Sequence, residues 1–289
     1  MTLKDYVNDA RVCHYSLGTF VTGIVSGGLS ILSKKFKKFY YETGQNSLNK
    51  YLVYENGLKY YNIKGVKVSE MPWGNFNDIL CVYCYYNDDY SKEIVEKFKG
   101  EGTYCYKDID IDVTIKEGDV VIDAGASVGE FCAYTAYKKA LCYAFEPTES
   151  RYEKLCVTAN LNSGKIIPVK MGLSDSCSVA QIVTEGIASP SMVLTIGGTK
   201  SEEIELITLD QYVNDNNIAK VDFIKSDIEG AERQLLRGAT NVLKTFAPKL
   251  SICTYHLPDD PEVLAEIILT ANPKYKIAQG KSKLYAAIP

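Results

Sequence analysis

Apolar and polar positions follow two different periods along this chain, and the period predicts which element each segment forms. From residue 119 onward, short apolar runs typical of buried strands alternate with longer segments whose apolar residues recur at helical spacing. The apolar runs predict strands at 120–123, 141–145, 166–170, 221–225, 249–255, 274–278 and 284–288. The amphipathic segments predict helices that begin near residue 129 and that cover 149–161, 209–217, 231–246 and 261–271.

This alternation of strands and helices predicts an α/β fold with a parallel, doubly wound sheet. The last two runs follow each other without a helix between them, so they predict an antiparallel hairpin at the edge of that sheet. Three more β-type runs lie between residues 178 and 207, with Gly197-Gly198 separating two of them. They predict a β element inserted near the edge of the sheet where a ligand would bind.

The region before residue 110 differs in composition and in its hydrophobic pattern. Twelve of the 22 tyrosines lie between Tyr40 and Tyr106, among short alternating runs that Asn56-Gly57 and Lys64-Gly65 interrupt. Asn-Gly between two β-type runs is a strong hairpin signal. We therefore predict two parts: an N-terminal helix with a β-rich cap over 1–110, and the main domain over 111–289. The tyrosines either line a binding surface over the active site or serve simply as strand residues.

An apolar segment at 17–32 precedes a basic run at 34–38. The segment is too short for a membrane span, and the N-terminus has no signal-peptide pattern. It predicts a helix with one apolar face, which either lies on an anionic membrane surface or packs against protein, across a homo-oligomer for example. The polar face before the basic run carries almost no charge, which favours the packing helix.

The composition and net charge limit the kinds of binding partner and the cellular setting that we expect. Hydrophobic residues make up 46% of the chain and charged residues 24%, which is ordinary for a globular protein with a large core. The net charge is −4, and no long basic arm is present, so nothing indicates nucleic-acid binding. The nine cysteines are an odd number scattered through apolar runs, which favours a reducing, cytoplasmic setting. Cys81 and Cys84 form a lone CxxC pair, which fits two strand residues better than a zinc site.

The segment from Asp119 to Glu146 has the pattern of a nucleotide-cofactor site. Gly125 and Gly129 bracket a turn of small residues between the first strand and the helix, whose N-terminus points back into the turn. Glu146 ends the second strand, 21 residues after Gly125. An acid about 20 residues after such glycines can accept hydrogen bonds from both ribose hydroxyls.

The composition of the turn favours one cofactor class. A dinucleotide site has the pattern GxGxxG, but Ala126 stands between Gly125 and Gly129, so its side chain would face a pyrophosphate. Asp123 opens the turn, and an acid there suits a cationic or ammonium-bearing ligand. S-adenosylmethionine carries a ribose, an α-amino group and a sulfonium but no phosphate, so the residues favour it over NAD.

Five polar side chains are expected at or just past the carboxyl ends of strands, where ligands bind in open α/β sheets. They are Asp123, Glu146, Asp227, Glu229 and His256. Each alone has an ordinary structural explanation, for example as a helix cap or as a first-turn acid. Together on one rim, they predict an active site.

Several segments then resemble a known family. They are VVIDAGASVGEF (120–131), AFEP (144–147), ITLDQYV (207–213), FIKSDIEGAERQLLRGA (223–239) and YH (255–256). They are similar to the FkbM family of S-adenosylmethionine-dependent methyltransferases. The resemblance implies a Rossmann-like class I methyltransferase sheet of seven strands with the last one antiparallel. It also implies O-methylation of a hydroxyl on a sugar, glycan or related natural product. The family usually has Asn at the position of Ser127.

The resemblance and the residues together suggest a mechanism. The cofactor's methionine end is assigned to the turn, its ribose to Glu146 and its adenine edge to Gly172 and Leu173. The turn residues are Asp123, Ala124, Gly125, Ala126, Ser127 and Gly129. His256 is the first candidate for the base, because a neutral imidazole is available near pH 7. Asp227 is the second, and with Glu229 it could instead hold a divalent cation.

Two other classes of function stay open from the sequence. An NAD-type oxidoreductase would share the fold and the ribose acid, and a non-catalytic binding protein could have kept the fold. A cofactor-binding comparison separates all three.

Overall fold

The computed structural model describes residues 51–63, 65–70, 103–185 and 200–289. The predicted helix at 17–32, the basic run at 34–38 and the Cys81–Cys84 pair lie outside these residues. The proposed homo-oligomer through that helix, and the cytoplasmic setting, stay predictions. Among the helices of the described ranges, none has both the length and the apolar character needed to cross a membrane.

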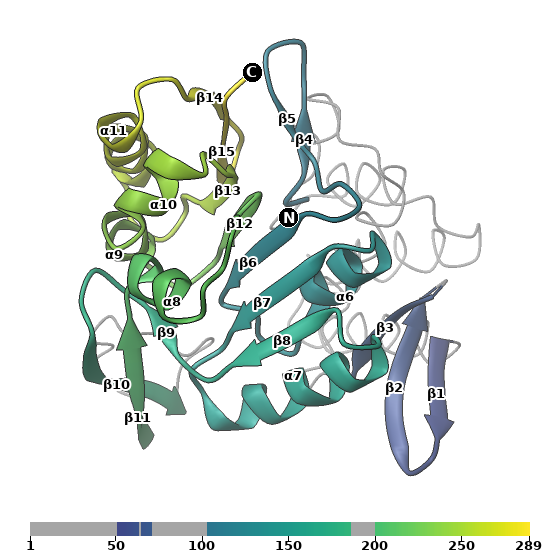
Figure 1. Cartoon of the computed structure of the whole chain (residues 1–289). Helices are drawn as coiled ribbons and strands as arrows, with labels where there is room; N and C mark the ends of the chain where they lie inside the picture. The colour runs from purple at the N-terminus through teal and green to yellow at the C-terminus, as the bar shows by residue number, and fades with distance from the viewer. Residues whose placement is uncertain (1–50, 64, 71–102, 186–199) are drawn as a thin grey trace, which may run out of the picture.

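A seven-stranded sheet forms the centre of the structure (Figure 1). Its order is β14 (Lys276–Gln279), β15 (Lys283–Ala287), β13 (Lys249–Cys253), β12 (Phe223–Ser226), β6 (Val120–Ala124), β7 (Leu141–Phe145) and β8 (Ile166–Val169). β15 runs antiparallel to both of its neighbours, and the other neighbouring strands pair in parallel. The predicted parallel sheet with an antiparallel closing hairpin is therefore confirmed, with the last strand of the chain as the reversed one.

Helices cover both faces of this sheet. They are α6 (Glu130–Tyr137), α7 (Glu149–Leu161), α8 (Leu209–Asp215), α9 (Glu232–Arg237), α10 (Thr240–Thr245) and α11 (Asp260–Ala271). Successive strand residues point to opposite faces, so Val121 packs into the core under α6 and α7, while Ile122 packs into the core under α8–α11. Both residues are fully buried. This two-sided burial explains why the strands read as continuous apolar runs.

The predicted single helix at 231–246 is wrong. The segment forms two short helices, α9 and α10, which are separated at Gly238 and Ala239. A Cβ atom on Gly238 would lie 2.0 Å from the carbonyl oxygen of Ser174. The backbone at Ser174 therefore packs directly on Gly238, and the helix is interrupted there. Apolar periodicity continues through the interruption, so it could not reveal the break.

Replacing Gly238 with Ala is expected to lower the free energy of unfolding by about 1–3 kcal/mol, because the new methyl group overlaps a backbone oxygen that cannot rotate away. Thermal or urea unfolding of the full chain measures this. Asn241→Ala, on the exposed surface of α10, is the matched control and should change stability by less than about 0.5 kcal/mol. Equal stability of Gly238→Ala and the native chain would contradict the close approach.

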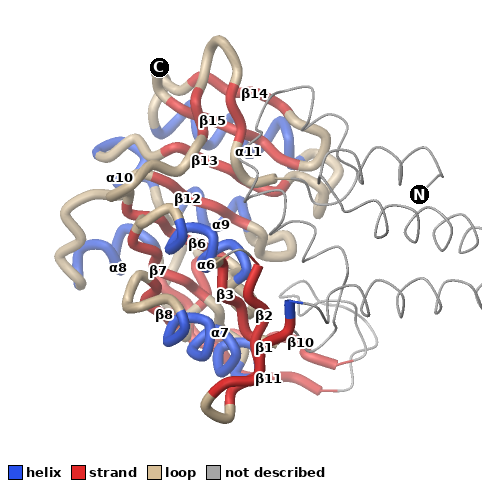
Figure 2. Tube along the Cα trace, turned by 90° about the vertical axis from the view of Figure 1, so that its right-hand side faces the viewer, coloured by secondary structure: helices blue, strands red, loops and turns tan. Residues whose placement is uncertain are grey.

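A small antiparallel sheet precedes the main domain. It consists of β1 (Leu52–Glu55), β2 (Leu58–Ile63) and β3 (Val66–Ser69), and Asn56 and Gly57 form the first turn with φ angles of 51° and 77°. Positive φ at both turn residues confirms the predicted Asn-Gly hairpin. The sheet packs beside α7, at the β8 edge of the main sheet (Figures 1 and 2). The backbone N–H of Ser69 donates to Thr158 Oγ1 at 2.9 Å, which ties β3 to α7.

The segment from 103 to 115 shares the core of the main domain. It contains the short hairpin of β4 (Tyr106–Lys107) and β5 (Asp112–Val113). The ring of Tyr106 stacks on that of Tyr285 in β15, with 4.7 Å between the centroids. Cys105 and Val113 are fully buried in the same hydrophobic cluster. The division of the chain at residue 110 stays a prediction, and these contacts bring residues before it into contact with the main sheet.

The predicted inserted β element is present next to the sheet. β10 (Ser178–Glu185) and β11 (Lys200–Ile207) pair antiparallel, and β11 pairs in parallel with β9 (Gly172–Leu173). Ile182 and Ile204 are buried on one side of this hairpin. Gly197-Gly198 lies outside the described residues.

Candidate active site

The glycine turn after β6 lies against the ends of the two neighbouring strands, β7 and β12. The backbone N–H groups of Gly125 and Ala126 both donate to the carbonyl oxygen of Phe145, at 3.1 and 2.9 Å. Gly125 has a φ of 76°, and a Cβ atom on it would lie 2.0 Å from the carbonyl oxygen of Asp227. Both the backbone conformation and the space therefore require glycine here. The turn thus joins the ends of β6, β7 and β12 at one point.

Ser127 occupies the tip of the turn in the left-handed conformation, with a φ of 52°. Its backbone N–H donates to Glu146 Oε2 at 3.1 Å, so the turn and the carboxylate of Glu146 are directly linked. Asn adopts this conformation more readily than Ser does. This gives a physical reason for the Asn that the FkbM family usually has at this position, and the structure keeps the turn with Ser.

Glu146 lies at the end of β7 and is 3% exposed. Its Oε1 accepts hydrogen bonds from the backbone N–H and the hydroxyl of Thr148, at 3.0 and 2.6 Å. Burial raises the pKa of this carboxyl, although Arg151, Thr148 and the Ser127 N–H oppose the shift. With the Ser127 contact, three of about four acceptor positions are used, so the carboxylate is held firmly and keeps capacity for a ligand hydroxyl.

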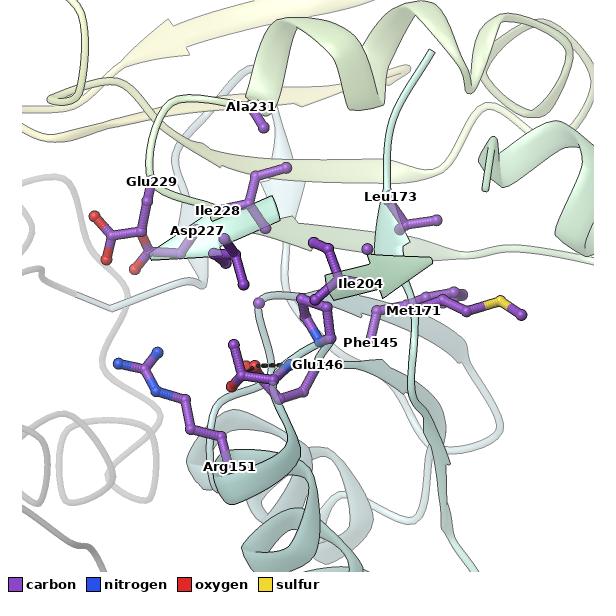
Figure 3. A pocket seen from close by; sticks show the side chains of 15 residues that line it. Phe145, Glu146, Arg151, Met171, Leu173, Ile204, Asp227, Ile228, Glu229 and Ala231 are labelled. Atoms are coloured by element: carbon purple, nitrogen blue, oxygen red, sulfur yellow. Dashed lines mark hydrogen bonds between the residues drawn. The ribbon is translucent and has the colours of Figure 1, made fainter. Parts of the chain in front are cut away.

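A pocket opens beside Glu146, with an empty volume of about 540 Å³ that includes space open to solvent. Its apolar lining includes Phe145, Leu173, Ile182, Ile204 and Ile228. Its charged lining groups lie on two sides, with Glu146 and Arg151 on one and Asp227 and Glu229 on the other (Figure 3). An apolar slot that ends in a few polar groups is the usual form of a cofactor site.

Asp123 does not face this pocket. Its carboxylate is fully buried in the core, where Lys225 Nζ lies 2.9 Å from Oδ1 and Cys132 Sγ donates to Oδ2 at 2.8 Å. Lys225 Nζ also donates to the carbonyl oxygen of Gly125 at 2.7 Å. Burial acts to lower the pKa of Lys225, but the carboxylates of Asp123 and Asp227 outweigh it and raise that pKa well above its usual value. Asp123 can therefore orient the turn through Lys225.

Asp227 directly follows β12, on the opposite side of the pocket from Glu146 (Figure 3). Its Oδ2 accepts the hydroxyl hydrogen of Tyr104 at 2.6 Å, and its Oδ1 accepts that of Tyr255 at 2.9 Å. Burial acts to raise the pKa of this carboxyl, but Lys225, Lys283 and the two hydroxyls lower it overall. Asp227 is thus held ionised in a fixed orientation.

His256 lies behind Asp227 among three carboxylates, and its side chain is 9% exposed. Nδ1 lies 3.2 Å from Glu232 Oε1, and Nε2 lies 3.4 Å from Glu229 Oε2 and 3.6 Å from Asp227 Oδ1. Burial acts to lower the pKa of His256, but Glu229, Glu232 and Asp227 raise it to about 10. The sequence-based choice of His256 as base assumed a neutral imidazole, and these carboxylates disfavour that form near pH 7.

The structure brings most of the predicted site residues to one place. Gly125, Glu146, Gly172, Leu173, Asp227 and Glu229 line the pocket. Ala124, Ala126, Ser127 and Gly129 form the end of β6 and the turn beside it, while Asp123 and His256 lie behind its wall. The roles assigned to these residues stay predictions.

Sequence reasoning missed Lys225, Tyr104, Arg151 and the two isoleucines of the inserted hairpin. A lysine in the middle of the buried strand β12 was a usable signal, because a buried charge needs a partner. Tyr104 carried no such signal, because it reaches Asp227 from 123 residues away.

A seven-stranded sheet of this order, with an acid at the end of its second strand beside a glycine turn, is the Rossmann-like class I methyltransferase arrangement that the resemblance implies. Comparison with known proteins identifies the family. The model of the methyltransferase FkbM domain matches residues 123–275, which is more than half of the chain, and the chain belongs to this family.

Individual relatives are more distant. The hexuronic acid methyltransferase AglP of Haloferax volcanii is 29% identical over 159 residues, which are 54% of this chain and 64% of that protein. The structure of a methyltransferase FkbM from Methylobacillus flagellatus KT has 17% identity and a TM-score of 0.47, and the match covers 84% of this chain and 58% of that one. A fibrillarin from Aeropyrum pernix, in complex with natively bound S-adenosyl-L-methionine, has 11% identity and a TM-score of 0.43, with coverage of 82% and 84%. This chain thus spans about three-fifths of the length of the first two relatives.

Proposed function

We propose that this protein is an S-adenosylmethionine-dependent O-methyltransferase that acts on a hydroxyl of a sugar, a glycan or a related natural product. The observation that carries the proposal is the buried carboxylate of Glu146, which is fixed at the end of β7 and lines the pocket next to the glycine turn. Membership of the FkbM methyltransferase family supports it.

The pocket residues fit this cofactor. Glu146 would accept a ribose hydroxyl, and the apolar side of Phe145, Leu173 and Ile204 would take the adenine ring. The turn at Gly125–Ser127 would hold the methionine end, and the absence of a Cβ atom on Gly125 keeps the backbone of Asp227 within contact distance. When bound, S-adenosylmethionine supplies an electrophilic methyl group for an acceptor oxygen.

The residues at the other side of the pocket would position the acceptor. Asp227 and Glu229 line the pocket and present carboxylates that can accept the hydrogen of an acceptor hydroxyl. The hydroxyls of Tyr104 and Tyr255 hold Asp227 in one orientation. Fixing the acceptor oxygen in line with the methyl group supplies much of the rate, and removal of its proton is worth about 10²–10⁴-fold.

The class of acceptor is inferred from the relative AglP, which is a hexuronic acid methyltransferase. We infer an acceptor with free sugar hydroxyls and take a hexuronic acid glycan as the first compound to test. Arg151 lines the pocket with the carboxylates of Asp227 and Glu229, and together they provide donors and acceptors for such a polar ligand.

Two measurements test the proposal. Calorimetry should show that S-adenosylhomocysteine binds to the full chain and that NAD does not. Incubation with S-adenosylmethionine and hexuronic acid oligosaccharides should add the mass of one methylene group to the sugar. Binding of NAD in place of S-adenosylhomocysteine would make the protein an oxidoreductase. Binding of neither would support a non-catalytic binding protein.

A further inference from the structure

The most unusual group next to the pocket is the imidazole of His256. Its side chain is more than nine-tenths buried, and neither ring nitrogen makes a hydrogen bond to the described residues. Burying polar nitrogens without hydrogen bonds is costly, so such groups usually serve a ligand or a reaction. Around it, ligand atoms of Asp227, Glu232 and His256 all lie within 4.8 Å of one another.

The two sides of the imidazole differ. On the Nδ1 side, Glu232 is held by the backbone, because its Oε1 accepts the N–H of Ile228 at 2.8 Å and its Oε2 accepts that of Gly230 at 3.0 Å. It lies 3.2 Å from Nδ1 and can orient the ring. On the Nε2 side lie Asp227 and Glu229, which also line the pocket.

We propose that Nε2 of His256, Asp227 and Glu229 form a binding site for a divalent first-row metal ion, with Glu232 as the residue that orients the histidine. The proposal builds on the proposed function of this same site. Two ligand atoms at about 2.1 Å from one ion lie about 3.0–3.4 Å apart in octahedral or tetrahedral geometry. The distances from Nε2 to Glu229 Oε2 and Asp227 Oδ1, 3.4 and 3.6 Å, are close to this spacing.

The arrangement matches the usual support of metal-bound histidines, in which a carboxylate on the second ring nitrogen fixes the ring and leaves the first nitrogen for the metal. The turn contributes as well. Glu229 and Gly230 both have positive φ angles, 57° and 101°, so the chain turns sharply immediately after Asp227. One imidazole with two carboxylates suits Mn²⁺, Fe²⁺ or Zn²⁺ better than Ca²⁺.

The metal ion would bind the acceptor hydroxyl at the pocket wall. It would lower the pKa of that hydroxyl, so that the proton leaves to a water molecule. The oxygen lone pair would then form the new C–O bond as the methyl–sulfur bond breaks, and its electron pair would stay on the sulfur of the departing S-adenosylhomocysteine. Asp227 and Glu229 would then act as ligands that place the oxygen. Binding through Nε2 requires the neutral imidazole, so the metal ion would displace the proton that the surrounding carboxylates otherwise hold on the ring.

The test uses Mn²⁺ alone on the metal-stripped full chain, followed by electron paramagnetic resonance. One Mn²⁺ per chain is expected, and its signal should carry the nuclear modulation of an imidazole nitrogen, a measurement that requires no variant. His256→Ala and Glu229→Gln should each weaken Mn²⁺ binding by at least about ten-fold. The chain has only two histidines, so His14→Ala is the matched control and should bind as the native chain does.

The outcomes separate this inference from the proposed function. No Mn²⁺ binding at millimolar concentration, no nitrogen modulation, or equal binding by His256→Ala would overturn the metal site, and Nε2 would then carry a proton. S-adenosylhomocysteine binding is measured on the same metal-free sample. If S-adenosylhomocysteine binds but no Mn²⁺ site is found, the proposed methyltransferase function stands and the metal site is rejected. If Mn²⁺ binds but S-adenosylhomocysteine does not, the metal site stands and the proposed function is rejected.

Discussion

Replacing Lys225 with Met is expected to lower the free energy of unfolding by about 3–5 kcal/mol, the cost typical of breaking a buried ion pair by removing one partner. The carboxylate of Asp123 is fully buried, and Lys225 Nζ, 2.9 Å away, is its counter-charge in the described structure. Met fills nearly the same space, so the loss reports the charge and not a cavity. Urea unfolding of the full chain, with and without the substitution, measures it.

A double-mutant cycle separates the pair from its surroundings. Asp123→Asn in the Lys225→Met background should recover much of the lost stability, because the uncompensated charge is then removed. Lys139→Met is the matched surface control. Lys139 forms an ion pair with Glu117 at 3.0 Å in which both side chains are about two-thirds exposed, so its loss should cost at most about 1 kcal/mol. Similar costs at Lys139 and Lys225 would contradict a buried ion pair that stabilises the fold.

The same pair connects the core to the site. Lys225 Nζ donates to the carbonyl oxygens of Gly125 and Ala124 at 2.7 and 3.3 Å, so it holds the turn from below. Asp123 was assigned to the turn from sequence because of its position at a strand end. The buried lysine explains how an acid that does not face the pocket can still influence it.

The sheet was predictable because each strand carries its own local signal. The run at 141–145 and the helix at 149–161 have the predicted bounds, since continuous apolar residues and helical spacing are short-range patterns. The Asn56-Gly57 turn was equally local, because Asn and Gly are the residues that tolerate positive φ. Glu146 was found from its spacing to Gly125, because one strand–helix–strand unit fixes that distance.

Contacts between distant segments were not predictable. The interruption at Gly238 depends on the backbone of Ser174, which passes directly over it. Tyr104 reaches Asp227 because the segment before β4 packs on β15, and no periodicity of the sequence encodes that contact. The sequence placed His256 directly after a strand at 249–255, but β13 ends at Cys253. The charge state of His256 depends on the carboxylates of Glu229 and Glu232, and Glu232 is buried in the first turn of α9.

Replacing Glu146 with Gln is expected to weaken S-adenosylhomocysteine binding by roughly 100-fold, because hydrogen bonds to a charged group are worth about 1.5–3 kcal/mol and the ribose would lose its charged acceptor. Gln keeps the size of the side chain and one acceptor oxygen. Calorimetry on the full chain measures the affinity. Glu149→Gln is the matched control, because Glu149 is an exposed acid three residues further on that pairs with Lys170. This variant should bind S-adenosylhomocysteine as tightly as the native chain does.

An analogue of S-adenosylhomocysteine without ribose hydroxyls tests directly whether Glu146 contacts the ribose. The native chain should bind the analogue far more weakly than the natural compound, because Glu146 then has no hydroxyl to accept from. The Glu146→Gln variant should bind the two compounds with nearly equal affinity, because the charged acceptor is already gone. If the variant still preferred the natural compound as strongly as the native chain does, Glu146 would not contact the ribose. The pocket beside β7 would then hold a different part of the ligand.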